Sequence, residues 1–129
     1  MKSESQHTAD ILRSLGRSGW KCRKLPGGRF ASGLPDAVLA KSGTCAMVEF
    51  KRPGTKKAKA SAAGLTGQQL TELTDWAAAG VRSYVAIIID IDKKVSCTLL
   101  RVQPDGTMID VGVANRLPRL DWSQIGNLL

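Results

Sequence analysis

Two short apolar segments on either side of Ser42-Gly43 constrain the fold more than any other part of the sequence. Residues 36–41 (DAVLAK) and 45–51 (CAMVEFK) have the length and apolar content of β-strands. A two-residue connection that contains glycine favours a tight turn between antiparallel strands. The sequence therefore predicts a β-hairpin over this region.

The predicted hairpin brings charged residues together at its open end. If the loop has two residues, Lys41 faces Thr44 and the numbers of all paired residues sum to 85. Asp36 then faces Glu49, and directly opposed residues of an antiparallel pair lie on one side of the sheet. Lys51, two residues after Glu49, shares that side. We expect two carboxylates and one ammonium to converge there.

The remaining segments predict an α/β fold with a mixed sheet. Apolar residues at helical spacing indicate helices over 4–18 and 66–79, and the apolar run 82–90 is typical of a central strand covered on both faces. Further strands are expected at 20–25 and, as a C-terminal β-hairpin around Pro104-Asp105-Gly106, at 95–102 and 107–113. With 129 residues and no visible boundary, the chain is interpreted as one domain, 1–129.

The net charge of +8 is unevenly distributed. Residues 1–60 hold 13 Lys/Arg and 4 Asp/Glu, a net of +9, whereas residues 61–129 hold 6 and 7, a net of −1. A basic half of this kind suits a polyanion such as nucleic acid. The alternative is a basic surface that serves solubility.

Several protein classes are excluded by what the sequence lacks. No apolar run approaches the ~18 residues of a membrane helix, and no hydrophobic stretch follows the N-terminal charge as in a secretory signal, so we expect a cytoplasmic protein without a membrane partner. Three dispersed cysteines without a C-x-x-C motif argue against disulfides and structural zinc. The only histidine, His7, is expected on the solvated surface. P-loop and G-x-S-x-G motifs are absent.

Opposed carboxylates repel each other unless something compensates their charge. A divalent cation such as Mg²⁺ or Mn²⁺, which prefers carboxylate oxygens, is the natural candidate between Asp36 and Glu49. Such an ion can activate water for attack on a phosphate, and Lys51 could hold that water or neutralise developing charge. The alternative is a surface ion pair between Glu49 and Lys51, with Asp36 capping a turn.

The order of motifs in this region resembles that of PD-(D/E)xK nucleases. Gly33-Leu34-Pro35-Asp36 is followed by Val48-Glu49-Phe50-Lys51 and Arg52-Pro53-Gly54, and Leu65-Thr66-Gly67-Gln68-Gln69 opens the second helix. The combination is most similar to stand-alone VRR-NUC domains of phages and bacteria, over about residues 4–90. The resemblance implies a restriction-endonuclease-like αβββαβ core flanked by helices, metal-dependent phosphodiester hydrolysis and often a homodimer. Residues 91–129, a C-terminal extension, match no part of it.

Carried over residue by residue, the resemblance makes Asp36 and Glu49 metal ligands, the backbone carbonyl of Phe50 a further ligand and Lys51 the catalytic lysine. Gln69 would lie at a helix start beside the site, where backbone N–H groups also favour phosphate; the alternative is a surface amide. Glu4 is a further candidate ligand, the alternative being a favourable interaction with the helix dipole. The implied cofactor is Mg²⁺ or Mn²⁺.

Basic residues around this set predict contacts with DNA phosphates. They lie on the strand expected at 20–25, in the Gly/Pro-rich loop from Pro26 to Pro35 and after the strand expected at 45–51: Lys21, Arg23, Lys24, Arg29, Arg52, Lys56, Lys57 and Lys59. For the last three, a solvated loop is the alternative. Trp20, Phe30 and Trp76 are expected in the core rather than as base-stacking platforms, with Phe30 left open.

The leading functional hypothesis is a metal-dependent endonuclease that cuts branched DNA, above all the four-way Holliday junction. Symmetric incision of a junction suits a two-fold homodimer, with the tail around Trp122 or the helix that bears Trp76 as its interface. Alternatives are a nickase or a flap or duplex nuclease of the same fold, and a non-catalytic nucleic-acid-binding module.

Overall fold

The computed structural model describes residues 3–26, 33–52 and 64–129, except for the side chain of Glu4. Within these ranges the chain forms two helices, six strands and two short 3₁₀ segments. In order these are α1 (Glu4–Arg17), β1 (Lys21–Lys24), β2 (Ala37–Lys41), β3 (Thr44–Lys51), α2 (Gly67–Ala78), β4 (Arg82–Ile91), β5 (Lys94–Val102), β6 (Met108–Asn115), η3 (Pro118–Leu120) and η4 (Ser123–Asn127).

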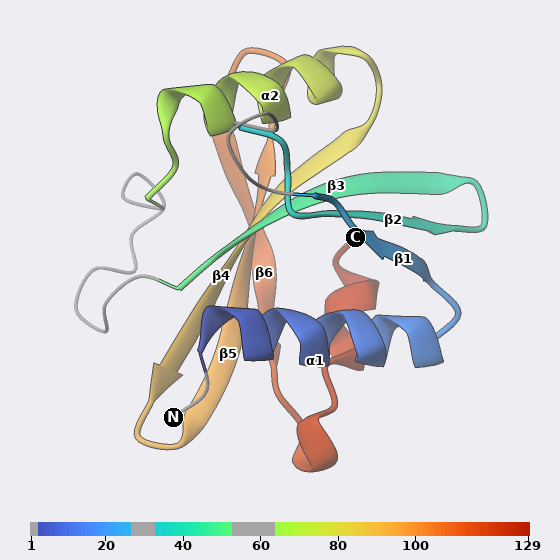
Figure 1. The fold of residues 1–129 in the computed structure, drawn as a ribbon, viewed down its shortest axis with the longest axis vertical. Coiled ribbons are helices and arrows are strands. Elements are labelled where there is room, and N and C mark those ends of the chain that lie inside the picture. Colours follow the sequence, from blue (N-terminus) through green and yellow to red (C-terminus); the bar gives the residue numbers. More distant parts are fainter. Residues whose placement is uncertain (1–2, 27–32, 53–63) are drawn as a thin grey trace.

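The six strands form one twisted sheet in which they lie side by side in sequence order (Figure 1). Strands β3 and β4 run parallel and are connected through α2, while all other neighbours are antiparallel. The predicted helix–three strands–helix–strand order and the C-terminal β-hairpin of β5 and β6 are confirmed. Strands β4 and β5 form a further hairpin that the sequence interpretation missed, with Asp92 and Lys93 at positive φ in its two-residue turn.

Helices cover opposite faces of the sheet, α1 one face and α2 the other (Figure 1). Alternate residues of β4 therefore enter two different cores: Tyr84, Ala86 and Ile88 pack on the α1 side, and Val85 and Ile87 on the α2 side. This double burial explains the continuous apolar run of the sequence and confirms β4 as a central strand.

The predicted register of the central hairpin is also confirmed. Strand β2 pairs with β3 from Ala37 opposite Val48 to Lys41 opposite Thr44, so that every pair sums to 85. Asp36 immediately precedes the first of these pairs. The turn residues Ser42 and Gly43 both have positive φ, as a two-residue hairpin loop requires.

Two aromatic side chains are placed differently from the expectation. Trp76 is 37% exposed, and its indole N–H donates to the carboxylate of Glu72, one turn earlier on α2, at 3.1 Å. Trp122 is fully buried and packs in the core on the α1 side together with Ile125 and Leu129. The tail around Trp122 is thus part of the folded core and cannot offer that side chain to a second subunit. Trp20 is buried as expected.

Among the described residues, no helix is long and apolar enough to cross a bilayer. The first helix begins at a capping box in which Ser3 and Gln6 exchange hydrogen bonds between side chain and backbone. Ile11 and Leu15 are completely buried and fix α1 on the sheet.

Candidate functional site

The centre of the site is Glu49, a carboxylate that β3 carries into a buried position. Glu49 lies opposite Val85 of the parallel strand β4 and is 3% exposed. Because Val85 belongs to the core on the α2 side, Glu49 faces α2. A buried carboxylate is costly unless charged or polar groups satisfy it, and two such groups are present.

The first partner is Lys51, two residues further along β3 on the same face. Its Nζ lies 3.4 Å from Oε2 of Glu49. The Lys51 side chain is 20% exposed and that of Glu49 is 4% exposed, so the ammonium lies between the buried carboxylate and solvent. A ligand that approaches from solvent would meet Lys51 first.

The second partner is Gln69, whose side chain forms hydrogen bonds with both β3 and the start of α2. Its Nε2 donates to Oε2 of Glu49 at 2.9 Å, and its Oε1 accepts from the backbone N–H of Thr66 at 3.0 Å. The backbone N–H of Gln69 in turn donates to the Thr66 hydroxyl at 3.1 Å, which completes a capping box at the start of α2. The N-terminus of α2 is thereby fixed against the buried carboxylate.

Asp36 directly precedes β2, which pairs with β3 on the side away from β4. Its Oδ2 accepts a 2.9 Å hydrogen bond from the backbone N–H of Phe50, and its own carbonyl accepts one from Leu25 at 2.7 Å. Asp36 is therefore held between β1 and β3, beside the backbone that joins Glu49 to Lys51. The structure thus brings Asp36, Glu49, Lys51 and Gln69 together at one end of β3.

Gly33 explains how the segment before Asp36 can approach α2. It has φ of +84°, and a Cβ at this position would lie 2.9 Å from the backbone carbonyl atoms of Gln68. Only glycine fits both the left-handed backbone and the close contact. The glycine of the Gly33-Leu34-Pro35-Asp36 motif thereby allows the first turn of α2 to pack beside the carboxylates.

The predicted DNA-contacting residues are only partly described. Lys21, Arg23 and Lys24 are exposed on the edge strand β1; Arg23 lies opposite Val38 and shares the Glu49 face, whereas Lys24 lies on the other face. Arg52 is half-buried at the end of β3. Arg29, Phe30, Lys56, Lys57, Lys59 and the side chain of Glu4 lie outside the described part of the chain.

His7 is not the solvated residue that its polar neighbours suggested. It is completely buried, and its Nε2 lies 3.2 Å from Oδ2 of Asp90 in β4. Burial lowers the pKa of His7 below its ordinary value, although Asp90 opposes this shift; the positive charges of Arg116 and Arg52 lower the pKa further. The position of His7 one turn before Ile11, on the buried stripe of α1, is the signal that could have revealed it.

Comparisons with known proteins give a match in structure and none in sequence. No family model and no curated protein sequence matches the chain. Among solved structures, the Holliday junction resolvase Hjc of Archaeoglobus fulgidus superposes with a TM-score of 0.57, at 17% identity, over 78% of this chain and 77% of that one. The chain has a restriction-endonuclease-like fold. This fold, with its mixed sheet flanked by helices, confirms the fold class expected from the sequence.

Proposed function

We propose that this restriction-endonuclease-like chain is a metal-dependent DNA endonuclease of the VRR-NUC type, acting on branched DNA and above all on the Holliday junction. One observation carries the proposal: Asp36, Glu49 and Lys51 meet at one end of β3, within a fold shared with a junction resolvase. Its place of action would be the cytoplasm of a bacterial or phage-infected cell.

The oxygen donors at this end of β3 fit a hard divalent cation. Asp36 and Glu49 each supply a carboxylate, and the backbone carbonyl of Phe50 between Glu49 and Lys51 would add a neutral oxygen. Mg²⁺ and Mn²⁺ prefer such ligands and retain several waters. Within the described residues no cluster of three His, Cys, Asp or Glu side chains exists, and Glu4 is the candidate for a further carboxylate. When bound, a divalent ion would act as a Lewis acid on the scissile phosphate and on the water that attacks it.

The protein side chains perform the remaining tasks of phosphodiester hydrolysis. Lys51, at the solvent side of Glu49, places a positive charge where negative charge develops on the phosphate. Gln69 is a positioning residue, because its amide fixes Oε2 of Glu49 and leaves little freedom to that carboxylate. The exposed basic residues of β1 would hold the DNA backbone beside the site.

Cleavage of a labelled four-way junction, a duplex and a flap in Mg²⁺ or Mn²⁺ tests the proposal. We expect the junction to be cut best, and expect Asp36→Asn and Lys51→Ala to lose at least ~10²-fold in rate while they still bind DNA. Preferential cutting of duplex or flap would support a nickase or flap nuclease. A wild-type protein that binds all three substrates and cuts none would be a binding module. Full activity of both variants would refute the assigned site.

A homodimer would supply the two active centres that paired incisions require. Because Trp122 is buried, α2 is the remaining candidate interface. The exposed Trp76 borders an apolar depression of about 310 Å³ that Val38 and Met47 also line. Sedimentation of the protein with and without junction DNA tests the dimer, and a monomer under both conditions would contradict it.

A further inference from the structure

A polar depression of about 520 Å³ lies where the end of α1 meets the turn of η3, away from the proposed catalytic residues. Its lining includes Arg17, Ser18, Arg119, Asp121 and Ser123. We propose that this depression binds a phosphate of the DNA backbone through the guanidinium groups of Arg17 and Arg119. The inference rests on the proposed function only in taking DNA as the ligand, and it assigns a role to the C-terminal extension.

The backbone that presents Arg119 adopts a conformation that its sequence does not favour. Arg119 has φ of 63° and the following residue, Leu120, has φ of 58°. Residues other than glycine rarely occupy this left-handed region, and two in succession are rarer still. Such strain persists only where surrounding contacts determine it, and it clusters at binding and catalytic sites.

The contacts that hold this turn are buried and specific. Ser14 of α1, 1% exposed, donates from Oγ to the carbonyl of Leu120 at 3.1 Å and accepts from the backbone N–H of Trp122 at 3.0 Å. Leu117 and Asp121 exchange two backbone hydrogen bonds of 2.7 and 3.2 Å across the turn. With Trp122 fully buried, the turn is anchored to α1. Arg119 is therefore displayed from a preorganised backbone, which lowers the ordering cost of binding.

The charges around the depression favour an anion. Arg17 and Arg119 are exposed, and neither forms an ion pair within the part of the chain that the structure describes. Asp121 carries the opposing charge, and hydrogen bonds from Ser123 hold its pKa below the ordinary value, with the positive charge of Arg17 adding to the shift. Two cations against one anion leave a net positive site. Guanidinium groups match the geometry of phosphate oxygens better than ammonium groups do.

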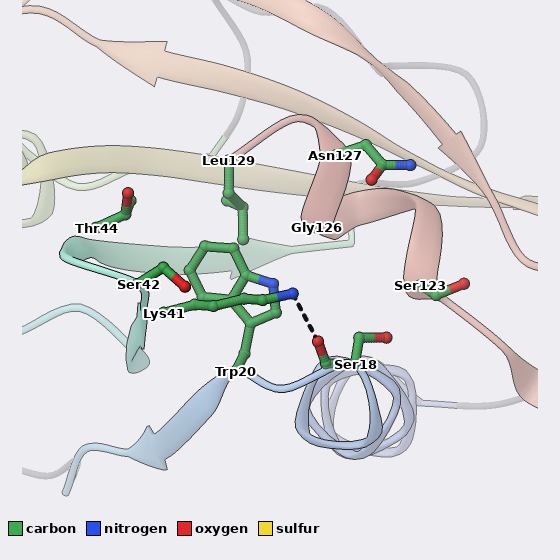
Figure 2. A pocket seen from close by; sticks show the side chains of 9 residues that line it. All are labelled: Ser18, Trp20, Lys41, Ser42, Thr44, Ser123, Gly126, Asn127 and Leu129. Atoms are coloured by element: carbon green, nitrogen blue, oxygen red, sulfur yellow. Dashed lines mark hydrogen bonds between the residues drawn. The ribbon is translucent and has the colours of Figure 1, made fainter.

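The neighbouring depression, of about 390 Å³, lacks this character (Figure 2). It shares Ser18 and Ser123 with the first, but its cation, Lys41, donates to the carbonyl of Ser18 at 2.7 Å. Lys41 thus compensates the negative end of the α1 dipole and stabilises the helix end. Trp20 and Leu129 supply apolar walls (Figure 2). The guanidinium pair therefore distinguishes the proposed phosphate site from its neighbour.

The position of the site indicates which part of a DNA substrate it would contact. The Lys41–Ser18 hydrogen bond ties the end of α1 to the β2–β3 turn, and Lys51 lies at the other end of β3. Thr44 and Lys51 are seven residue steps apart along β3, a length of ~23 Å. The depression also lies on the α1 side of the sheet, whereas Glu49 and Lys51 face α2 (Figure 1). The depression would therefore hold backbone remote from the scissile phosphate.

DNA binding without a divalent ion, followed by fluorescence anisotropy at several salt concentrations, tests the inference on the full chain. We expect Arg119→Ala to weaken junction binding and to reduce the log–log salt slope by ~0.9, the value for one phosphate contact. Asp121→Asn, which keeps an oxygen for the Ser123 N–H, should strengthen binding. Arg13→Ala is the matched control. Arg13 lies one turn before Arg17 on α1, its side chain is 60% exposed, and it forms an ion pair with Asp10. It should behave like the wild type in affinity and salt slope.

A second variant keeps the test independent of folding. Arg119→Gly also removes the guanidinium, but glycine accepts positive φ, so its unfolding temperature should not fall below that of the wild type. Unchanged binding in both Arg119 variants, or equal losses in Arg119→Ala and Arg13→Ala, would overturn the inference. Chemical-shift changes at Ser123 with inorganic phosphate, without any effect of Arg119→Ala on DNA, would overturn the assignment to nucleic acid. If the wild type cuts no substrate but these binding differences appear, the proposed function fails and the phosphate site stands.

Discussion

Oε2 of Glu49 accepts a 2.9 Å hydrogen bond from Nε2 of Gln69, a residue twenty positions later in the chain. The same amide side chain closes the capping box of α2 through the backbone N–H of Thr66. The start of a helix and the orientation of a buried carboxylate are therefore determined by one side chain. Any change that moves the first turn of α2 should also disturb Glu49.

Replacement of Gln69 by alanine should affect both activity and stability. Loss of the amide leaves a buried carboxylate with one fewer donor and removes half of a capping box, which costs about 1 kcal/mol of unfolding free energy. Because Gln69 orients the carboxylate that we propose as a metal ligand, we expect its removal to lower activity by ~10–100-fold. Urea unfolding and junction cleavage measure the two effects.

Thr66→Ala is the matched control for this change. It removes the hydroxyl that caps α2 but leaves the Gln69–Glu49 hydrogen bond in place. We expect a similar loss of stability, about 1 kcal/mol, with cleavage close to wild type below the unfolding transition. Equal losses of activity in both variants would show that helix capping, and not the orientation of Glu49, explains the effect.

Gly33→Ala should show the importance of the close approach between the Asp36 segment and α2. The new Cβ would meet the backbone of Gln68 at 2.9 Å, in addition to the cost of positive φ, so we expect a loss of about 1–3 kcal/mol and slower cleavage. Gly64→Ala provides a control, since Gly64 also has positive φ (+73°) but nothing within 4 Å of its added Cβ. Indistinguishable unfolding curves for the two variants would argue against a role for the contact.

The contact between buried His7 and half-buried Asp90 should make the stability of the protein depend on pH. Because burial lowers the pKa of His7 in the folded state below its unfolded value of ~6.5, the unfolded chain binds more protons as the pH falls below ~7. This contribution is fully present above the unfolded pKa and is lost as the pH falls toward the folded one. Unfolding free energies in urea at pH 7.5 and 5.5 measure the loss.

His7→Gln tests whether this histidine is the source of the pH dependence. Glutamine can still donate to Asp90 but does not titrate, so the difference in stability between pH 7.5 and 5.5 should shrink. The charged groups that act on His7, namely Asp90, Arg116 and Arg52, are unchanged in the variant. A wild type that gains stability toward pH 5.5, or a variant with the same pH difference, would contradict the prediction.

Features set by local rules could be predicted from the sequence, and features set by tertiary packing could not. The register that pairs Ala37 with Val48, with Asp36 directly before that pair, followed from a two-residue turn and a side-chain period of two. The proximity of Gln69 to Glu49 followed from the resemblance of the motif around Gln69 to that of a known family. By contrast, His7 is polar in sequence yet buried, because only the folded sheet brings Asp90 to it. Trp122 lies in a tail without periodicity, and its burial depends on the 3₁₀ turns that fold it onto α1.

Metal binding can be tested separately from cleavage through its effect on thermal unfolding. A ligand that binds only the folded protein stabilises it by RT ln(1 + [L]/Kd), about 2.7 kcal/mol at a hundredfold excess over Kd. We expect Mn²⁺ or Mg²⁺ to raise the unfolding temperature of the wild type.

Asp36→Asn should lose most of this metal-induced shift, yet it should fold normally because its amide oxygen can still accept from the Phe50 N–H. Lys51→Ala should keep or enlarge the shift, since the positive charge 3.4 Å from Glu49 is removed. A metal-induced shift that is equal in the wild type and in Asp36→Asn would exclude Asp36 as a ligand, whatever the cleavage assay shows.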